Sequence, residues 1–407
     1  MPAGVYLHVP FCKSRCSYCD FATEVYRDSV VVEQYVDTLC REIEGGNPSR
    51  SEGAPERRAE AKEGTLPTGR VSACVDTIYF GGGTPSLLTS RQVEQILEVI
   101  KSRFDVSEVA EITLEMNPAT VSAEKLEQYR SLGVNRASFG VQTFNDRHLK
   151  LLARGHDAHD ARQTYKLLRA AGFENISFDL IAGLPGQTIG DWKRNLDEAV
   201  SMDPEHLSLY LLEIHEGTPL AEQVRSGRRP IPDEDRAAEM YEVMIERLDR
   251  DGYMQYEISN FAKPGLESGH NTKYWRLDPV YGFGVSAHSF DGFQRYSNER
   301  DTAEYVGRIA EFGNAEVNRE TIDLASEFVF LGLRLNAGID LASFQDRFGI
   351  DLEREHRSDL DRFHEADLVE FHDGNLRLTQ KGMLFSNEVF QAFVTERSAI
   401  SVATQAS

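Results

Sequence analysis

The chain has 407 residues, of which 41% are hydrophobic and 27% are charged. These proportions are typical of a folded globular protein and exclude collagen-like and wholly disordered chains. Aspartate and glutamate together number 66 against 44 lysines and arginines, so the formal net charge is -22. A field of that sign repels the phosphates of nucleic acids, and we expect no nucleic-acid partner.

The N-terminal segment and the cysteines indicate the compartment. The chain begins MPAGVYLHVPF, without a basic segment before a long apolar stretch, and no window supplies ~18 consecutive apolar residues. Five cysteines are an odd number, and three of them crowd together near the N-terminus, unlike the disulfide framework of a secreted protein. We therefore expect a cytoplasmic protein that carries a metal site.

Short apolar segments alternate with amphipathic helical patterns over the first 250 residues. Strands are predicted at residues 5–9, 75–80, 111–115, 137–141, 176–181 and 206–212. Helices are predicted at residues 31–43, 90–102, 122–131, 158–171, 189–201 and 233–251. Serial β/α units form parallel sheets, and six strands predict an α/β protein built on a partial (β/α)6 barrel.

The C-terminal part has a different pattern. Helices are predicted at residues 321–335, 340–348 and 352–365, followed by a hairpin at 369–378 that turns at Asp373-Gly374 and a last helix at 380–393. This order predicts a small winged-helix-like α+β module. The expected domains are a barrel with accessory strands over 1–310, the module over 311–395 and a tail over 396–407. Residues 45–72 have almost no large apolar side chains and predict a disordered insertion.

Three cysteines predict a metal-binding motif in the loop after the first strand. Cys12, Cys16 and Cys19 have the spacing C-x3-C-x2-C. Three thiolates can hold a [4Fe-4S] cluster and leave one iron open. A structural zinc ion normally has four ligands. His8 is a candidate for the fourth, but the sequence does not fix the direction of its side chain, and zinc binding stays an alternative. Cys40 and Cys74 lie in helical and strand patterns and are assigned no chemistry.

Glycines and polar residues follow the later strands. The second strand ends in Gly81-Gly82-Gly83-Thr84-Pro85, where missing side chains let a ligand approach the backbone closely. Active sites of β/α barrels gather at the C-terminal ends of the strands. Four polar residues lie at or near the ends of the later strands and are candidate site residues: Glu115, Gln142, Arg154 and Asp179.

The cysteine spacing and the glycine stretch resemble the radical S-adenosylmethionine superfamily, and the order of motifs is similar to its coproporphyrinogen III oxidase-like branch over nearly the whole chain. In that superfamily, S-adenosylmethionine binds the open iron of the cluster and one electron cleaves it to a radical. The resemblance implies that Cys12, Cys16 and Cys19 hold the cluster, and that Arg154 pairs with a carboxylate. The S-adenosylmethionine contacts that it implies are Tyr6, Tyr18, Gly82, Gly83, Thr84, Glu115, Gln142 and Asp179.

The segment 270–275, His-Asn-Thr-Lys-Tyr-Trp, places a metal ligand beside two large aromatic rings, a composition that suits an iron porphyrin. It resembles the heme-chaperone branch of the family, in which His270 would be associated with heme. The oxidase carries a further cysteine two positions after the third, where this chain has Phe21, and a long N-terminal extension, whereas eleven residues precede Cys12 here. Both differences favour the chaperone branch. His288, in a glycine-rich segment, is a second candidate heme ligand.

The leading hypothesis is an iron-sulfur protein that binds S-adenosylmethionine and heme and passes heme to an acceptor protein, with the respiratory membrane as one location for that acceptor. Such a protein also needs a reductant for its cluster. The alternative is an enzyme, a radical oxidative decarboxylase acting on the propionates of coproporphyrinogen III. Whether S-adenosylmethionine is cleaved and whether the protein is a homodimer stay open. Radical modification of tRNA is disfavoured by the negative charge.

Overall fold

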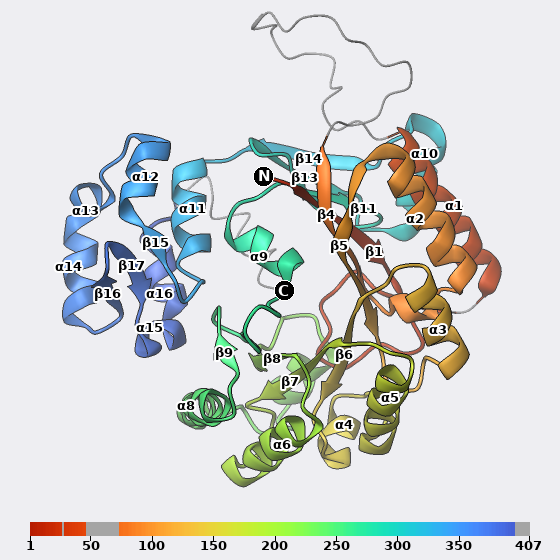
Figure 1. Ribbon diagram of the computed structural model, residues 1–407. Helices are drawn as coiled ribbons and strands as arrows, with labels where there is room; N and C mark the ends of the chain where they lie inside the picture. The colour runs from red at the N-terminus through yellow and green to blue at the C-terminus, as the bar shows by residue number, and fades with distance from the viewer. Residues whose placement is uncertain (27, 46–72, 395–407) are drawn as a thin grey trace, which may run out of the picture.

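The computed structural model describes residues 1–26, 28–45 and 73–394 (Figure 1). The predicted insertion, apart from Gly45, and the predicted tail therefore lie outside the described residues. The predicted division at residue 310 stays a prediction; the strand that follows it pairs with the large sheet. No helix in the described ranges is long and apolar enough to cross a membrane.

Six parallel strands form the centre of the large sheet, and they lie side by side in chain order. They are β1 (Ala3–Val9), β4 (Cys74–Gly82), β5 (Asp105–Met116), β6 (Arg136–Gln142), β7 (Asn175–Ala182) and β8 (His206–Leu211). The sheet curves around the centre of the molecule without closing (Figure 1). The predicted α/β class and partial (β/α)6 barrel are confirmed.

Short strands extend this sheet to twelve at its two edges. β11 (Val280–Phe283) pairs parallel with β1, and β12 (His288–Phe290), β13 (Gln294–Asn298) and β14 (Glu316–Thr321) continue antiparallel. At the other edge β10 (Asn260–Ala262) and β9 (Met254–Gln255) follow β8. A separate pair, β2 (Phe11–Cys12) and β3 (Glu24–Val25), flanks the cysteine loop. These strands were not predicted individually, because runs of two to six residues show little periodicity.

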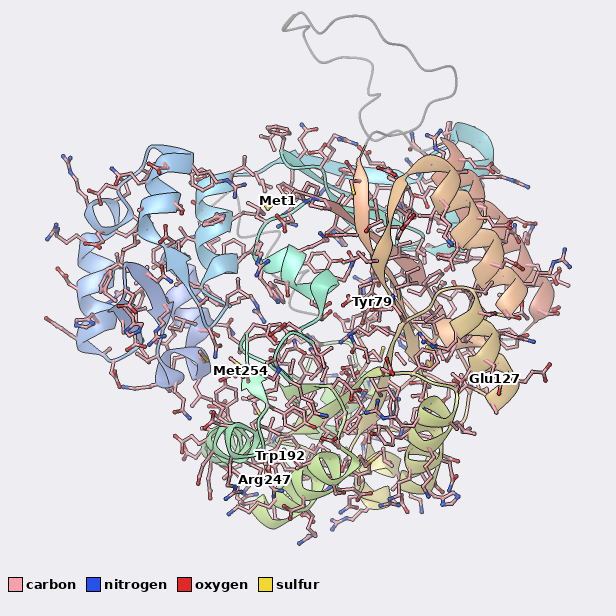
Figure 2. The ribbon with its side chains drawn as sticks, viewed as in Figure 1. Met1, Tyr79, Glu127, Trp192, Arg247 and Met254 are labelled. Carbon is pink, nitrogen blue, oxygen red and sulfur yellow. The ribbon has the colours of Figure 1, made fainter. Side chains whose placement is uncertain are left out.

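Helices cover the outer face of the curved sheet (Figure 1). They are α1 (Ser29–Gly45), α2 (Ser90–Arg103), α3 (Ala123–Ser131), α4 (Asp146–Leu151), α5 (Ala158–Ala170), α6 (Ile189–Met202), α8 (Glu234–Arg250) and α10 (Thr302–Phe312). The short helix α7 (Pro219–Arg225) begins beside the cysteine loop. Capping boxes start α2, α5 and α6. Trp192 lies buried between α6 and α8, and its indole N–H donates to the carbonyl of Met240 (Figure 2).

The two faces of the sheet differ in polarity. Ile78 and Phe80 of β4 are fully buried against the helices, whereas Tyr79 lies on the face toward the centre of the molecule (Figure 2). By the alternation of strand side chains, the inner positions of the six strands are polar or glycine. From β4 to β8 the inner residues are Thr77, Tyr79, Gly81, Glu111, Thr113, Glu115, Arg136, Ser138, Gly140, Asn175, Ser177, Asp179, His206, Ser208 and Tyr210. A packed hydrophobic core requires no polar side chains. The polar inner face is therefore where we look for a ligand site.

The C-terminal module packs beside the open side of the barrel (Figure 1). It consists of α11 (Leu324–Gly332), β15 (Ile339–Asp340), α12 (Leu341–Phe348), α13 (Leu352–Glu355), α14 (Arg357–Glu365), β16 (Val369–His372), β17 (Asn375–Leu378), α15 (Gln380–Leu384) and α16 (Ser386–Gln391). The hairpin turns at Asp373 and Gly374, both with positive φ, as predicted. The predicted helices 352–365 and 380–393 are each divided in two, at His356 and Phe385.

One further helix, α9 (Gly269–Trp275), lies within the curve of the sheet, between the sheet and the module (Figure 1). It contacts β1, β4 and α11. This helix carries the predicted heme-binding histidine, so the fold places that residue on the inner side of the barrel.

Candidate cluster and ligand site

The cysteine loop is held to the barrel at Ser17. Its backbone N–H donates to the carbonyl of Leu152 (2.9 Å) and its hydroxyl to that of Leu151 (3.1 Å). In turn, the Ser17 carbonyl accepts from the N–H of Leu220 at the start of α7 (2.7 Å). These bonds fix the loop against the ends of two helices while the cysteines on either side of Ser17 stay at the mouth of the barrel.

The thiols of the loop already receive hydrogen bonds from the barrel. The Thr84 hydroxyl lies 3.5 Å from the Cys12 sulfur, and the Arg154 guanidinium lies 3.3 Å from the Cys16 sulfur. Burial raises the pKa of Cys12 to about 11 and raises that of Cys19. Within the described ranges, no three His, Cys, Asp or Glu side chains are grouped closely enough to hold one metal ion. A [4Fe-4S] cluster needs no such convergence, because each thiolate binds its own iron, so the donor set fits that group.

Asn117 joins the two sides of the cysteine loop. Its side-chain oxygen accepts from Arg154 (2.6 Å), and its amide nitrogen donates to the Thr84 hydroxyl (2.8 Å). A continuous chain of hydrogen bonds therefore runs from Cys16 through Arg154, Asn117 and Thr84 to Cys12. Asn117 was missing from the predicted site. Its position directly after the third parallel strand is the signal that could have identified it.

The glycine stretch packs against the end of β1. Gly82 has φ +101°, and a Cβ atom at Gly83 would lie 2.7 Å from the Pro10 carbonyl. The N–H of Gly83 donates to the carbonyl of Val9 (2.8 Å). A side chain at Gly82 would also collide with the ring of His8, at 2.8 Å. The glycines thus bring Thr84 beside the first cysteine, an arrangement that side chains would prevent.

Gln142 folds back toward Arg154. Its φ is +66°, in the left-handed region that is unfavourable for glutamine, and the strand register shifts between Gly140 and Gln142. A Cβ atom at Gly140 would lie 2.5 Å from the Gln142 amide nitrogen and 3.1 Å from Arg154. The Gly140 carbonyl accepts from Arg154 (2.7 Å). Backbone strain of this kind concentrates at ligand sites, which supports a binding role for this corner.

Two acids lie on the inner face near this network. Burial raises the pKa of Glu115 to about 7, partly opposed by the Tyr79 hydroxyl, which donates to it at 2.7 Å. Burial raises the pKa of Asp179 to about 6, opposed by a hydrogen bond from Ser208. Both groups are therefore able to donate as well as accept hydrogen bonds near neutral pH. Tyr18 packs against Leu152 and Ile181 and interacts electrostatically with Asp179 and Arg154.

An aromatic stack crosses from this region to α9. The ring of Tyr6 stacks on Tyr79 (6.2 Å between centroids) and on His270 (6.3 Å), and Tyr79 stacks on His270 (5.0 Å). The Tyr6 hydroxyl bonds to Nδ1 of His8 (3.1 Å). Tyr79 was not predicted as a site residue, although it alternates with the glycines on the inner face of β4.

His270 is buried in the present structure, with a side chain 1% exposed. Its Nδ1 bonds to the Thr77 hydroxyl (2.9 Å) and its Nε2 to the Tyr274 hydroxyl (3.1 Å). Burial lowers its pKa to about 3, so the ring is neutral at pH 7, as a metal ligand must be. Binding of iron to His270 would require one of these two hydrogen bonds to open. His288, by contrast, is exposed at the start of β12.

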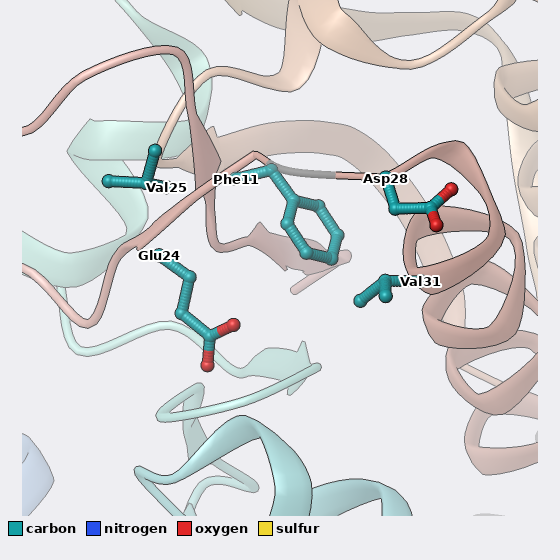
Figure 3. Close-up of a pocket in the computed structure, with 5 residues that line it drawn as sticks. All are labelled: Phe11, Glu24, Val25, Asp28 and Val31. Atoms are coloured by element: carbon teal, nitrogen blue, oxygen red, sulfur yellow. The ribbon is translucent and has the colours of Figure 1, made fainter.

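A cavity of about 400 Å³ lies beside the cysteine loop (Figure 3). It is lined by Phe11, Glu24, Val25, Asp28 and Val31. It includes none of the predicted site residues, which face the inside of the barrel. The candidate site is therefore the polar inner face from the cysteine loop to α9, and the cavity of Figure 3 does not include its predicted residues.

Comparisons with known proteins agree with this arrangement. The model of the radical SAM superfamily matches residues 6–199, and that of the HemN C-terminal domain matches residues 320–385. The heme chaperone HemW of Bacillus subtilis is 36% identical over 97% of this chain and 99% of its own. The heme chaperone HemW of Escherichia coli is 32% identical, again over 97% and 99%.

Among solved structures, coproporphyrinogen III oxidase (HemN) from Escherichia coli, described as a radical SAM enzyme, superposes with a TM-score of 0.81. The alignment covers 97% of this chain and 90% of the oxidase, at 24% identity. At that identity the likeness shows a shared fold, including the C-terminal module, and leaves the activity to other evidence.

Proposed function

Because the chain belongs to the heme chaperone HemW family within the radical SAM superfamily, we propose that it binds a [4Fe-4S] cluster, S-adenosylmethionine and heme, and transfers the heme to an acceptor protein. The observation that carries the cluster assignment is the hydrogen-bonded chain from Cys12 to Cys16 through Asn117. It orients two of the three thiols from the barrel itself. The heme acceptor and the reductant for the cluster are partners that this proposal requires.

Each predicted residue has a physical role in this proposal. Cys12, Cys16 and Cys19 hold the cluster, which supplies an open iron and a transferable electron when bound. Arg154 places a positive charge beside the cysteines and would pair with the carboxylate of S-adenosylmethionine. Glu115 has a buried carboxyl group, which would bind the amino group of S-adenosylmethionine. The remaining contacts with S-adenosylmethionine would come from Tyr6, Tyr18, Gly82, Gly83, Thr84, Gln142 and Asp179.

We assign heme binding to His270 on α9. A neutral imidazole beside large aromatic rings suits an iron porphyrin. The hydrogen bond to Tyr274 lies within the same short helix, so a small movement of one tyrosine frees Nε2. His288, which is exposed on the neighbouring strand β12, is the second candidate ligand.

An anaerobic titration of the cluster-reconstituted protein with hemin, followed by absorbance, tests the proposal. We expect saturable one-to-one binding, weakened at least about tenfold by His270→Ala. His372→Ala is the matched control, because His372 lies exposed in the C-terminal module; its affinity should equal that of the wild type.

Two outcomes would change the assignment. Loss of affinity in His288→Ala but not in His270→Ala would move the heme ligand to β12. Absence of saturable hemin binding in the wild type would refute the chaperone function. In that case, decarboxylation of coproporphyrinogen III under anaerobic, reducing conditions would establish the oxidase alternative.

A further inference from the structure

Arg136 is a fully buried arginine on the inner face of the barrel. It is the first residue of β6 and is 2% exposed, whereas the alternate residues Ala137 and Phe139 pack in the core beneath the helices. Its backbone pairs with Thr113 of β5 on one side and Asn175 of β7 on the other. Arg136 lies on the polar inner face but is not one of the predicted site residues, and the proposed function assigns it no role.

The Nε of Arg136 is buried and has no hydrogen-bond partner in the part of the chain that the structure describes. The two neighbours in register share this condition, because the hydroxyl of Thr113 and the side-chain oxygen of Asn175 are also buried without partners. Buried polar atoms are nearly always hydrogen-bonded, so three adjacent unpartnered atoms indicate a place for a polar ligand.

The surroundings show which way the guanidinium faces. Its charge acts on Glu115 of β5, Asp179 of β7, His206 of β8 and His270 of α9. These groups converge only inside the curve of the sheet. Burial raises the pKa of both acids, whereas the positive charge of Arg136 lowers it, so the guanidinium faces both carboxyl groups.

We propose that Arg136 binds a carboxylate of a ligand inside the barrel, and that this carboxylate is a propionate of the porphyrin; the second statement rests on the proposed function. A planar guanidinium pairs with a carboxylate through two parallel hydrogen bonds. S-adenosylmethionine also has a carboxylate, but a different arginine, Arg154, lies at the end of β6 near the cysteine loop. There it donates a hydrogen bond to the carbonyl of Gly140. Four residues of strand, about 13 Å, separate Gly140 from Arg136.

Paired titrations of wild type and Arg136→Gln with hemin and with hemin dimethyl ester test this proposal. The ester has no ionised propionates. We expect Arg136→Gln to weaken hemin binding about tenfold or more and to leave binding of the ester unchanged. Arg103→Gln is the matched control, since Arg103 lies on the outer helix α2 and its Nε is likewise unpartnered; it should alter neither affinity.

The ligand-free proteins provide a second readout. Because Arg136→Gln removes a buried charged group whose Nε makes no hydrogen bond, its melting temperature should equal or exceed that of the wild type. A clear fall would identify Arg136 as a structural residue and overturn the proposal.

The remaining outcomes separate the hypotheses. Equal hemin affinity of wild type and Arg136→Gln would overturn the role of Arg136 while the proposed function stands, with water as the partner of the three orphaned groups. If Arg136→Gln weakened binding of S-adenosylmethionine and left hemin binding intact, the proposal that Arg136 binds a propionate would be overturned. Arg136 would then bind the carboxylate of S-adenosylmethionine. A wild type that binds neither porphyrin would refute both the proposed function and this inference.

Discussion

At the scale of single residues, the hydrogen bonds around the cysteine loop depend on the side-chain amide of Asn117, which both accepts and donates. Asn117 accepts a hydrogen bond from a charged group, Arg154, and donates one to a hydroxyl, Thr84. Aspartate cannot donate, and alanine offers neither function. Hydrogen bonds to charged groups contribute more than neutral ones, so the bond to Arg154 is the stronger of the two.

We therefore expect Asn117→Ala to lower the free energy of unfolding of the cluster-free protein by about 1–3 kcal/mol, because it leaves buried groups unsatisfied. Asn117→Asp keeps the partner of Arg154 and should lose less. Urea denaturation measures both, and iron content after reconstitution should fall more in the alanine variant. Equal stability of Asn117→Ala and wild type would show that the hydrogen-bonded chain is dispensable.

At the scale of elements, the short helix α9 is held at both of its ends. The N–H groups of Gly269 and His270 donate to the two oxygens of Glu111 on β5 (3.0 and 3.1 Å). Near the other end, Lys273 pairs with Asp76 (2.7 Å) and donates to a carbonyl of the N-terminal segment. A carboxylate at a helix N-terminus satisfies free N–H groups and interacts favourably with the helix dipole. Seven residues would not form a stable helix alone, so these contacts position His270.

Replacing Glu111 should loosen this helix. We expect Glu111→Ala to reduce the free energy of unfolding by about 2 kcal/mol, since it removes two charge-assisted hydrogen bonds. Glu108→Ala on the same strand is the control, because Glu108 is exposed, and should have little effect. Chemical denaturation measures the difference. If the two variants were equally stable, α9 would be held by its other contacts.

At the scale of the whole molecule, Glu42 connects parts of the chain that are far apart in sequence. This buried residue of α1 accepts hydrogen bonds from the N–H of Gly284 (2.8 Å), the Asn298 amide (2.5 Å) and the Tyr305 hydroxyl (2.7 Å). Gly284 has φ +99°, and a Cβ atom there would lie 2.6 Å from the His8 carbonyl. Glu42 thus holds the strands added at the β1 edge against the first helix.

Burial raises the pKa of Glu42 from 4.5 to about 7, so the folded protein keeps a proton that the unfolded chain releases between these values. The stability from this proton is complete below about pH 4.5 and is lost as the pH rises through 7. The stability of wild type relative to Glu42→Gln should therefore fall by about 3 kcal/mol between pH 4 and pH 8. Denaturation across this range measures it, with the exposed Glu44→Gln as control. Parallel profiles would contradict the shift.

The parallel strands and most outer helices could be predicted because their side chains repeat locally. Apolar residues at alternate positions, as in β4, are sufficient to indicate a strand, and the order of β/α units implies a parallel sheet. The edge strands β9 to β12 are short and carry few apolar residues, so their existence depends on neighbours distant in sequence. The helix breaks at His356 and Phe385 fall at residues that are neither glycine nor proline, so no helix-breaking residue marks them in the sequence.

The sequence by itself determined the parts of this protein that depend on spacing along the chain: the cysteine motif, the glycine turn, the β/α order and the family. Only the tertiary structure decided which polar groups meet. Asn117 bridges Arg154 and Thr84, and the unpartnered Nε of Arg136 belongs to a residue that pairs with Thr113, because parallel strands bring together residues separated by 20 to 40 positions. Local sequence encodes which face of a strand a residue occupies, whereas its partners across the sheet depend on register and curvature, which arise only when the whole chain has folded.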